Sequence, residues 1–230
     1  MSQALGSVNP PASPGRGRAP EDGHTEVRAG GQEPPVESAE RRRAVDAATR
    51  VYLAGESLDM SGLAQELGIG RATLYRHVGN RDQLLTTVLA EATERTYRKA
   101  IAAARGRGVP LVLDVLEQMM RAVDGSEPLQ ALTRREPARF IRMALLPGAI
   151  ESVSARLVAE VLEGERAAGH LEPGLAAPVL GEAIVRICDV HLYAPLLGGD
   201  PPRIDTALDL VALLLGSPRG WRPGRGGGRT

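Results

Sequence analysis

The chain has 230 residues, of which 43% are hydrophobic and 24% are charged, so it is long enough to bury one core or a small and a larger one. Its 28 basic and 28 acidic residues cancel, which excludes a basic field over the whole protein, and its single cysteine excludes an intramolecular disulfide framework. Because no run of 18 apolar residues and no apolar signal core occurs, we expect a soluble, cytoplasmic protein without a membrane partner.

Both ends of the chain have the composition of disordered segments. Residues 1–38 contain six Pro, six Gly and no aromatic residue, and residues 216–230 are rich in Gly, Arg and Pro. Such stretches bury too little apolar surface to offset the entropy of ordering. We therefore expect a disordered arm and a disordered tail, with nucleic-acid contact by their arginines as the less favoured alternative.

Residues 39–86 are expected to form a three-helix DNA-binding domain. An apolar stripe at helical spacing marks the first helix: Ala44, Ala47, Ala48, Val51 and Tyr52. Two short amphipathic helices follow, with Leu63 on the inner face of one and Leu74 and Val78 on the inner face of the other. Gly68 between them suits the positive φ of a helix C-terminus. This pattern is typical of a helix-turn-helix, whose second helix enters the major groove of DNA.

The second helix and the start of the next one carry the expected DNA-binding residues. These are Gly70, Arg71, Ala72, Thr73, Tyr75, Arg76, His77, Asn80 and Arg81. We expect Arg71, Ala72 and Thr73 to meet base edges, and Tyr75 and His77 to face outward and donate to phosphates. Arg81 is expected on the DNA backbone, and Asn80 is expected to cap the following helix together with Gln83.

The charges around this segment favour the same interpretation. Residues 41–107 contain 12 cationic and seven acidic side chains, so the cationic surplus is local even though the chain as a whole is neutral. Neutralisation of phosphates supplies most of non-specific DNA binding. The alternative is a solvated polar helix face without a ligand.

Residues 87–215 are expected to form a second, larger helical domain. A long fourth helix over residues 81–104 ends at the Gly- and Pro-containing stretch 105–110. Helical periodicity then continues to residue 215, without an alternating run of strand type and without an internal repeat. Beyond the stretch that begins at Leu111, the expected helices cover residues 127–135, 137–146, 149–169, 173–196 and 204–215. The fold class is therefore all-α.

Apolar and adaptable side chains in this second domain are candidates for an effector pocket between helices. They are Met119, Met120, Val123, Phe140, Met143, Cys188, His191 and Tyr193. The alternative for each is an ordinary core position. Arg186 either binds a polar ligand group or pairs with Asp189 or Glu182. Cys188 and His191 have no second ligand pair, so we expect no metal site and no cofactor.

The last two long helices carry more apolar residues than one buried stripe needs. Val179, Leu180, Ile184, Ile187 and Val190 lie on the first, and five leucines and Val211 lie on the second. A helix that is apolar over most of its surface is buried on more than one side. We therefore expect a homodimer in which two helices from each subunit form an intermolecular four-helix bundle.

Two sets of motifs carry a resemblance to a known family. The segment LAQELGIGRATLYRHVGNRDQLL, within residues 39–89, resembles the TetR family of bacterial transcription regulators. The C-terminal pieces ARFIRMAL, AIVRICDVHLYA and GGDPPRIDTA resemble the QsdR-type subgroup of that family. The resemblance implies dimeric binding to double-stranded operator DNA, and its subgroup implies repression of genes for lactone breakdown that a lactone-like ligand relieves.

The sequence thus favours a ligand-responsive transcriptional regulator, a dimeric repressor that binds a palindromic operator and is released by a small apolar effector. A DNA-binding activator or architectural protein without an effector is the first alternative. A helical enzyme or interaction module that has lost DNA binding is the second. Because the motifs GxSxG, HExxH, GxxxxGK[ST] and GxGxxG after a strand are absent, we expect no enzyme activity.

Overall fold

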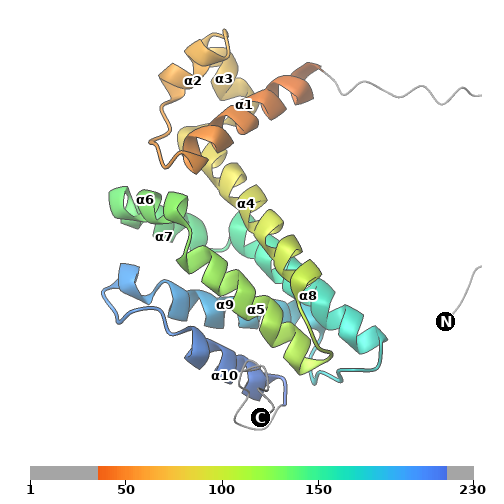
Figure 1. Ribbon diagram of the computed structural model, residues 1–230. Coiled ribbons are helices and arrows are strands. Elements are labelled where there is room, and N and C mark those ends of the chain that lie inside the picture. Colours follow the sequence, from red (N-terminus) through yellow and green to blue (C-terminus); the bar gives the residue numbers. More distant parts are fainter. Residues whose placement is uncertain (1–35, 217–230) are drawn as a thin grey trace, which may run out of the picture. The chain divides into compact units, whose positions relative to one another are not determined.

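The computed structural model describes residues 36–216 (Figure 1). Its helices are α1 (Val36–Leu53), α2 (Met60–Glu66), α3 (Arg71–Val78), α4 (Arg81–Ala103), α5 (Val109–Asp124), α6 (Glu127–Arg135), α7 (Pro137–Ala144), α8 (Ala149–Ala167), α9 (Ala177–Leu192), the 3-10 helix η1 (Ala194–Leu197) and α10 (Ile204–Leu214). The described residues contain no strand, and the all-α prediction is confirmed for them. Most of the expected arm and tail, residues 1–35 and 217–230, lies outside the described residues.

Two apolar cores hold these helices together. The first joins α1, α2, α3 and the beginning of α4, and it also includes Leu132 of α6 and Phe140 and Ala144 of α7. The second joins the end of α4 with α5, α8, α9 and α10. Tyr193, directly after α9, packs against both cores. The DNA-binding helices are therefore in apolar contact with the rest of the fold through α6, α7 and Tyr193.

Helix α4 belongs to both cores. Asn80 caps it as expected, since its Oδ1 accepts from the Gln83 amide at 2.9 Å and the Asn80 amide donates to the Gln83 side chain at 2.8 Å. Its first half buries Leu84 and Val88 in the first core, and its second half buries Tyr97 in the second. The expected boundary between residues 86 and 87 falls inside this helix, which Figure 1 shows running from α1 to the side of α5 and α8.

Helices α8 and α9 pack closely because small residues meet at their crossing. A Cβ atom built on Gly181 of α9 would lie 2.5 Å from the Ala155 carbonyl oxygen and 3.3 Å from the Ala159 Cβ atom, both on α8. No side chain larger than hydrogen fits there without movement of the backbone. Among residues 36–216, no helix combines the length and the apolar character that a bilayer-crossing segment needs.

Candidate DNA-binding surface and effector cavity

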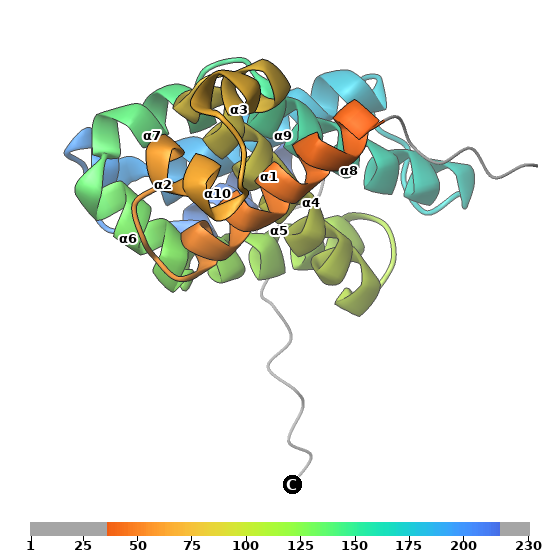
Figure 2. The ribbon, with the colours of Figure 1, turned by 90° about the horizontal axis from the view of Figure 1, so that it is seen from above.

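The turn between α2 and α3 is built as the sequence predicts. Asp59 caps α2, because its two carboxylate oxygens accept from the amides of Ser61 and Gly62, each at 2.9 Å. These two donors lower the pKa of the Asp59 carboxyl. Gly68 has φ of 68°, the left-handed conformation expected of it, and Gly70 is the N-cap of α3 without a side-chain hydrogen bond. Figure 2 shows α3 lying beside α1 and α2.

Most of the polar residues expected to contact DNA lie on one open face of α3. Leu74 and Val78 are buried in the first core, which fixes the opposite face of the helix. Arg71, Ala72, Tyr75 and Arg76 are exposed, as is Gly70 at the N-cap, and Thr73 is partly exposed. Their placement permits the contacts that the sequence predicts, and DNA contact itself stays a prediction.

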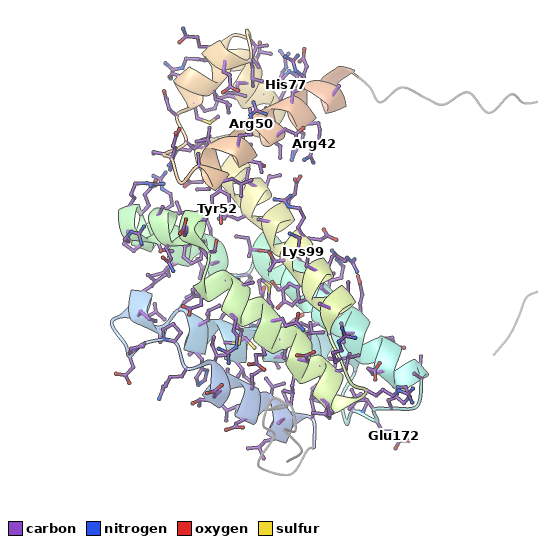
Figure 3. All side chains as sticks on the ribbon, in the orientation of Figure 1. Arg42, Arg50, Tyr52, His77, Lys99 and Glu172 are labelled. Atoms are coloured by element: carbon purple, nitrogen blue, oxygen red, sulfur yellow. The ribbon has the colours of Figure 1, made fainter. Side chains whose placement is uncertain are left out.

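The expectation that His77 faces outward is wrong. Its side chain is only 3% exposed, and its Nε2 atom lies 2.6 Å from a carboxylate oxygen of Glu40 on α1. The alignment is not that of a normal hydrogen bond for either ring nitrogen. Position 77 lies at the edge of the buried face of α3, and α1 covers it. His77 therefore packs α3 onto α1 and does not reach toward a phosphate (Figure 3).

Arg81 also differs from the expectation. Its Nη1 and Nη2 atoms donate to the two carboxylate oxygens of Glu136 at 2.8 and 2.6 Å, and its Nε atom donates to the Leu58 carbonyl at 2.8 Å. This pairing raises the pKa of the Arg81 guanidinium and lowers the pKa of the Glu136 carboxyl. The guanidinium is therefore occupied within the protein, where it ties the start of α4 to the junction of α6 and α7, and it is not free to bind the DNA backbone.

Further polar contacts cross the same junction. Arg139 on α7 lies 3.2 Å from Asp82 on α4 and 3.1 Å from Glu136. Arg135 at the end of α6 donates to the carbonyl oxygens of Gly55 and Glu56 in the loop after α1. Helices α6 and α7 therefore hold both the α1–α2 loop and the N-terminus of α4, the two places from which the helix-turn-helix leaves the rest of the fold.

A cavity of about 250 Å³ lies among α1 and α4 to α9. Six of the eight predicted pocket residues line it: Met119, Met120, Val123, Phe140, Cys188 and Tyr193. The rings of Phe140 and Tyr193 meet edge to face with centroids 5.1 Å apart. Met143 packs against the first core instead, and the His191 Nδ1 atom lies 2.8 Å from the Ile187 carbonyl oxygen. Neither of these two residues lines the cavity.

Sequence reasoning missed the cavity residues on α1, α4, α6 and α8, together with Asp189. Tyr52 and Leu53 of α1 line the cavity, as do Tyr97, Arg95 and Lys99 of α4. Figure 3 labels Tyr52 at the end of α1 and Lys99 on α4. The chain has four Tyr, one Phe and one Trp, and three of the tyrosines and the phenylalanine are in this wall. This concentration of rare aromatic residues is the signal that could have indicated the cavity. It can be recognised only if α1 and α4 are considered as parts of the cavity wall as well as of the DNA-binding part.

The cavity wall also contains polar groups. Asp189 lines it, and burial together with the nearby Glu151 carboxylate raises the pKa of Asp189 to about 7. Burial raises the pKa of the Cys188 thiol to about 12 and also raises the pKa values of Tyr97 and Tyr193. Arg186 does not pair with Asp189; it lies 2.9 Å from Glu151 and 3.7 Å from Glu182, on the outer surface. Among the described residues, no three His, Cys, Asp or Glu side chains gather where they could hold a metal ion.

Comparison with known proteins gives consistent results. The family model described as "Tetracyclin repressor-like, C-terminal domain" matches residues 107–216. The chain is 60% identical to the TetR-family transcriptional repressor QsdR of R. erythropolis, covering 81% of this chain and 99% of that one with a TM-score of 0.78. It is 28% identical over 181 residues to an HTH-type transcriptional repressor of Mycobacterium tuberculosis, covering 76% of this chain and 91% of the relative.

A more distant structure supports the fold alone. The TetR-family repressor AlkX of Dietzia sp. is 20% identical to the chain over 81% of this chain and 96% of that one, with a TM-score of 0.55. One assignment follows from the helix-turn-helix, the all-helical second part with its cavity and the 60% identity to QsdR. The chain belongs to the TetR family of transcription regulators, which are non-enzymatic DNA-binding proteins.

Proposed function

We propose that this protein is a dimeric repressor that binds a palindromic operator through α3 and releases it when a small, mainly apolar effector enters the cavity. The observation that carries the proposal is the composition of the cavity wall. Tyr52 and Leu53 belong to α1 of the DNA-binding part, whereas Met119, Phe140 and Asp189 belong to the helices beyond it. An effector that fills this space contacts both parts at once.

The exposed face of α3 supports the DNA contact. Arg71 and Ala72, in its first turn, are placed to meet base edges, where arginine pairs with guanine and a methyl group contacts thymine. Thr73 is proposed to reach the same bases, and Tyr75 and Arg76 to hold phosphates. His77 and Arg81 support this face from within the protein rather than by touching DNA.

Exposed apolar side chains support the dimer. Val179 and Val190 of α9 are 54% and 57% exposed, and three leucines of α10 are also exposed: Leu210, Leu213 and Leu214. Water-exposed apolar residues gathered along helices mark a protein interface. Pairing of two copies on this surface places two α3 helices on one duplex, whose successive major grooves are about 34 Å apart. Val190→Asp should produce monomers in analytical ultracentrifugation and weaken operator binding; an unchanged dimer mass contradicts this interface.

The proposed release mechanism is a change in the position of α3 relative to the second part. An effector that contacts Tyr52 and Phe140 changes the distance between α1 and α7. The Arg81–Glu136 pair transmits this change to the start of α4. A shift in the spacing of the two α3 helices then prevents simultaneous docking in both grooves. A 100-fold loss of operator affinity corresponds to about 2.7 kcal/mol of coupling between the two sites.

For the effector we propose an uncharged, lactone-like compound. The proposal follows from the resemblance of the C-terminal motifs to QsdR-type regulators and from the largely aromatic and aliphatic cavity wall. A filled core without a cavity would favour the alternative of a DNA-binding protein without an effector. The cavity of about 250 Å³ argues against this alternative.

Footprinting and gel-shift titration on the DNA upstream of the gene and its neighbours, with and without γ-decalactone, test the proposal. We expect a protected palindrome that Arg71→Ala alters, whereas Arg134→Ala, which removes an exposed arginine on α6, leaves binding unchanged. A ligand that binds the protein but leaves its operator affinity unchanged would overturn the release mechanism. Solitary subunits at micromolar concentration with operator present would overturn the dimer.

A further inference from the structure

Among the residues that the structure describes, Asp189 is the one carboxylate that lines the cavity. Within residues 39–216, its carboxyl oxygens have no ion-pair partner and no hydrogen-bond donor, and the half-buried residue lines the cavity from α9. A carboxyl group that is largely shielded from water and has no partner in the protein lowers stability unless water or a ligand supplies the missing hydrogen bonds. The cavity supplies the space for the missing partner.

The groups that face Asp189 hold their protons. Tyr97 of α4, Cys188 of α9 and Tyr193 after α9 are all kept neutral by burial, and Tyr52 of α1 lies beyond Tyr193. Glu151 of α8 adds a negative charge, which Arg186 partly balances on the outside. The residues that α5 and α7 contribute to the cavity are uncharged. Among the described residues, no cation forms an ion pair with Asp189 that would stabilise its ionised form.

The two cations of the wall lie elsewhere. Arg95 and Lys99 of α4 are exposed, so they mark the part of the cavity that opens toward solvent. Their positive charge repels a cationic ligand that approaches, and Asp189 with Glu151 disfavours an anionic one. An uncharged ligand meets neither obstacle.

We propose that Asp189 recognises the effector as a neutral carboxylic acid, donating its O–H to a carbonyl oxygen of an uncharged ligand, so that effector binding takes up a proton. This inference rests on the effector site of the proposed function and specifies the chemistry of its ligand. The aromatic wall of Tyr52, Phe140 and Tyr193 then contacts the apolar remainder of that ligand.

Effector binding should depend on pH with a definite sign. Because the pKa of Asp189 is about 7 in the empty cavity, the carboxyl is mostly protonated at pH 6 and mostly ionised at pH 8. A ligand that needs the protonated form binds about tenfold more tightly at pH 6 than at pH 8, since the protonated fraction changes by about that factor. A cationic ligand needs the ionised form and shows the opposite dependence.

Calorimetric titration of the full-length protein at pH 6 and pH 8 tests this. Three ten-carbon probes differ in charge: γ-decalactone is neutral, decylamine is cationic and decanoate is anionic. We expect γ-decalactone to bind best, with about tenfold higher affinity at pH 6. Repetition in buffers with different ionisation enthalpies should reveal the uptake of up to one proton for each ligand bound at pH 8.

Variants test whether Asp189 causes the pH dependence of effector binding. Asp189→Asn keeps a donor but cannot ionise, so its affinity for γ-decalactone should be independent of pH, and Asp189→Leu should bind weakly at both pH values. Glu182→Gln removes an exposed carboxylate from the same helix and should retain the wild-type pH dependence. Operator binding by each variant shows that it is folded. If Asp189→Asn does not fold, proton uptake by the wild-type protein still decides.

Equal affinity at both pH values, the absence of lactone binding at pH 6, or a preference for decylamine that grows with pH would each overturn the role of Asp189. Failure of the proposed function gives a different result: the lactone binds with proton uptake, but operator affinity does not change. Conversely, if a lactone releases the operator and binds with the same affinity at both pH values, the proposed repressor function stands, and only the role of Asp189 is excluded.

Discussion

Loss of the Glu136 carboxylate charge should lower the free energy of unfolding by about 2 kcal/mol. Arg81 and Glu136 are each 21% exposed, and they form two parallel N–H···O contacts of 2.8 and 2.6 Å. Exposed ion pairs contribute about 0.2–1 kcal/mol, and breaking a fully buried pair costs about 3–5 kcal/mol. A bidentate pair that is mostly but not fully buried lies between these limits.

A double-mutant cycle with Glu136→Gln and Arg81→Gln measures the pair itself. Urea unfolding at one fixed protein concentration gives the free energies, because dimerisation makes stability depend on concentration. We expect a coupling energy of about 2 kcal/mol, so the double variant loses much less than the sum of the single losses. Glu172→Gln, at an exposed carboxylate with no ion pair in the part of the chain that the structure describes, should change stability little (Figure 3).

The same pair predicts a pH dependence with a definite sign. The pKa of Glu136 is lowered from its ordinary value of 4.5 in the folded protein, so the pair contributes fully above pH 4.5. Its contribution disappears as the pH falls through the folded value. The stability difference between the wild-type protein and Glu136→Gln should therefore be constant from pH 7 to pH 5 and shrink below that. Additive single losses, or a difference that grows on acidification, would refute the reasoning.

Three further predictions concern packing, DNA reading and thiol chemistry. Gly181→Ala should lower the unfolding free energy by about 1–3 kcal/mol, because the added methyl group meets the backbone of α8 at Ala155; an unchanged melting temperature would contradict this crossing. Arg71→Ala should relax specificity at particular base pairs by about 1–3 kcal/mol, whereas Tyr75→Phe should weaken binding to all duplexes alike, and a uniform loss for Arg71→Ala in competition gel shifts would exclude base reading. Since the pKa of Cys188 is about 12, iodoacetamide should alkylate this sole cysteine at pH 8 on the order of 10³-fold more slowly than free cysteine, and rapid mass addition to the native protein would show a reactive thiolate.

Local structure could be read from the sequence where the signals are local. Helix α6 has the bounds predicted for it, because Ser126 caps it and the chain breaks again before Pro137. The turn at Gly68 and the capping box of Asn80 and Gln83 are likewise formed by residues within a few positions of one another. Six of the eight predicted pocket residues line one cavity, since apolar stripes show which helix faces turn inward.

The errors arose where a partner is distant in the chain. Glu40, which covers His77, comes from another helix, and Glu136 lies 55 residues beyond the Arg81 that it binds. Periodicity places a residue on a face of its own helix and does not tell what covers that face. Asp189 was missed for a related reason, because its significance depends on the cavity that residues from distant helices form around it and on the Glu151 carboxylate of α8 nearby.

Membership of α4 in both cores has a consequence for protein engineering. A chimera that transplants only residues 39–86 onto another regulator separates Leu84 and Leu85 from Val88 and Leu89, which pack in the same core. It also deprives the graft of Phe140 and Ala144, which cover it from α7. A transplant of operator specificity should therefore exchange the exposed residues of α3 and leave the recipient's own scaffold in place.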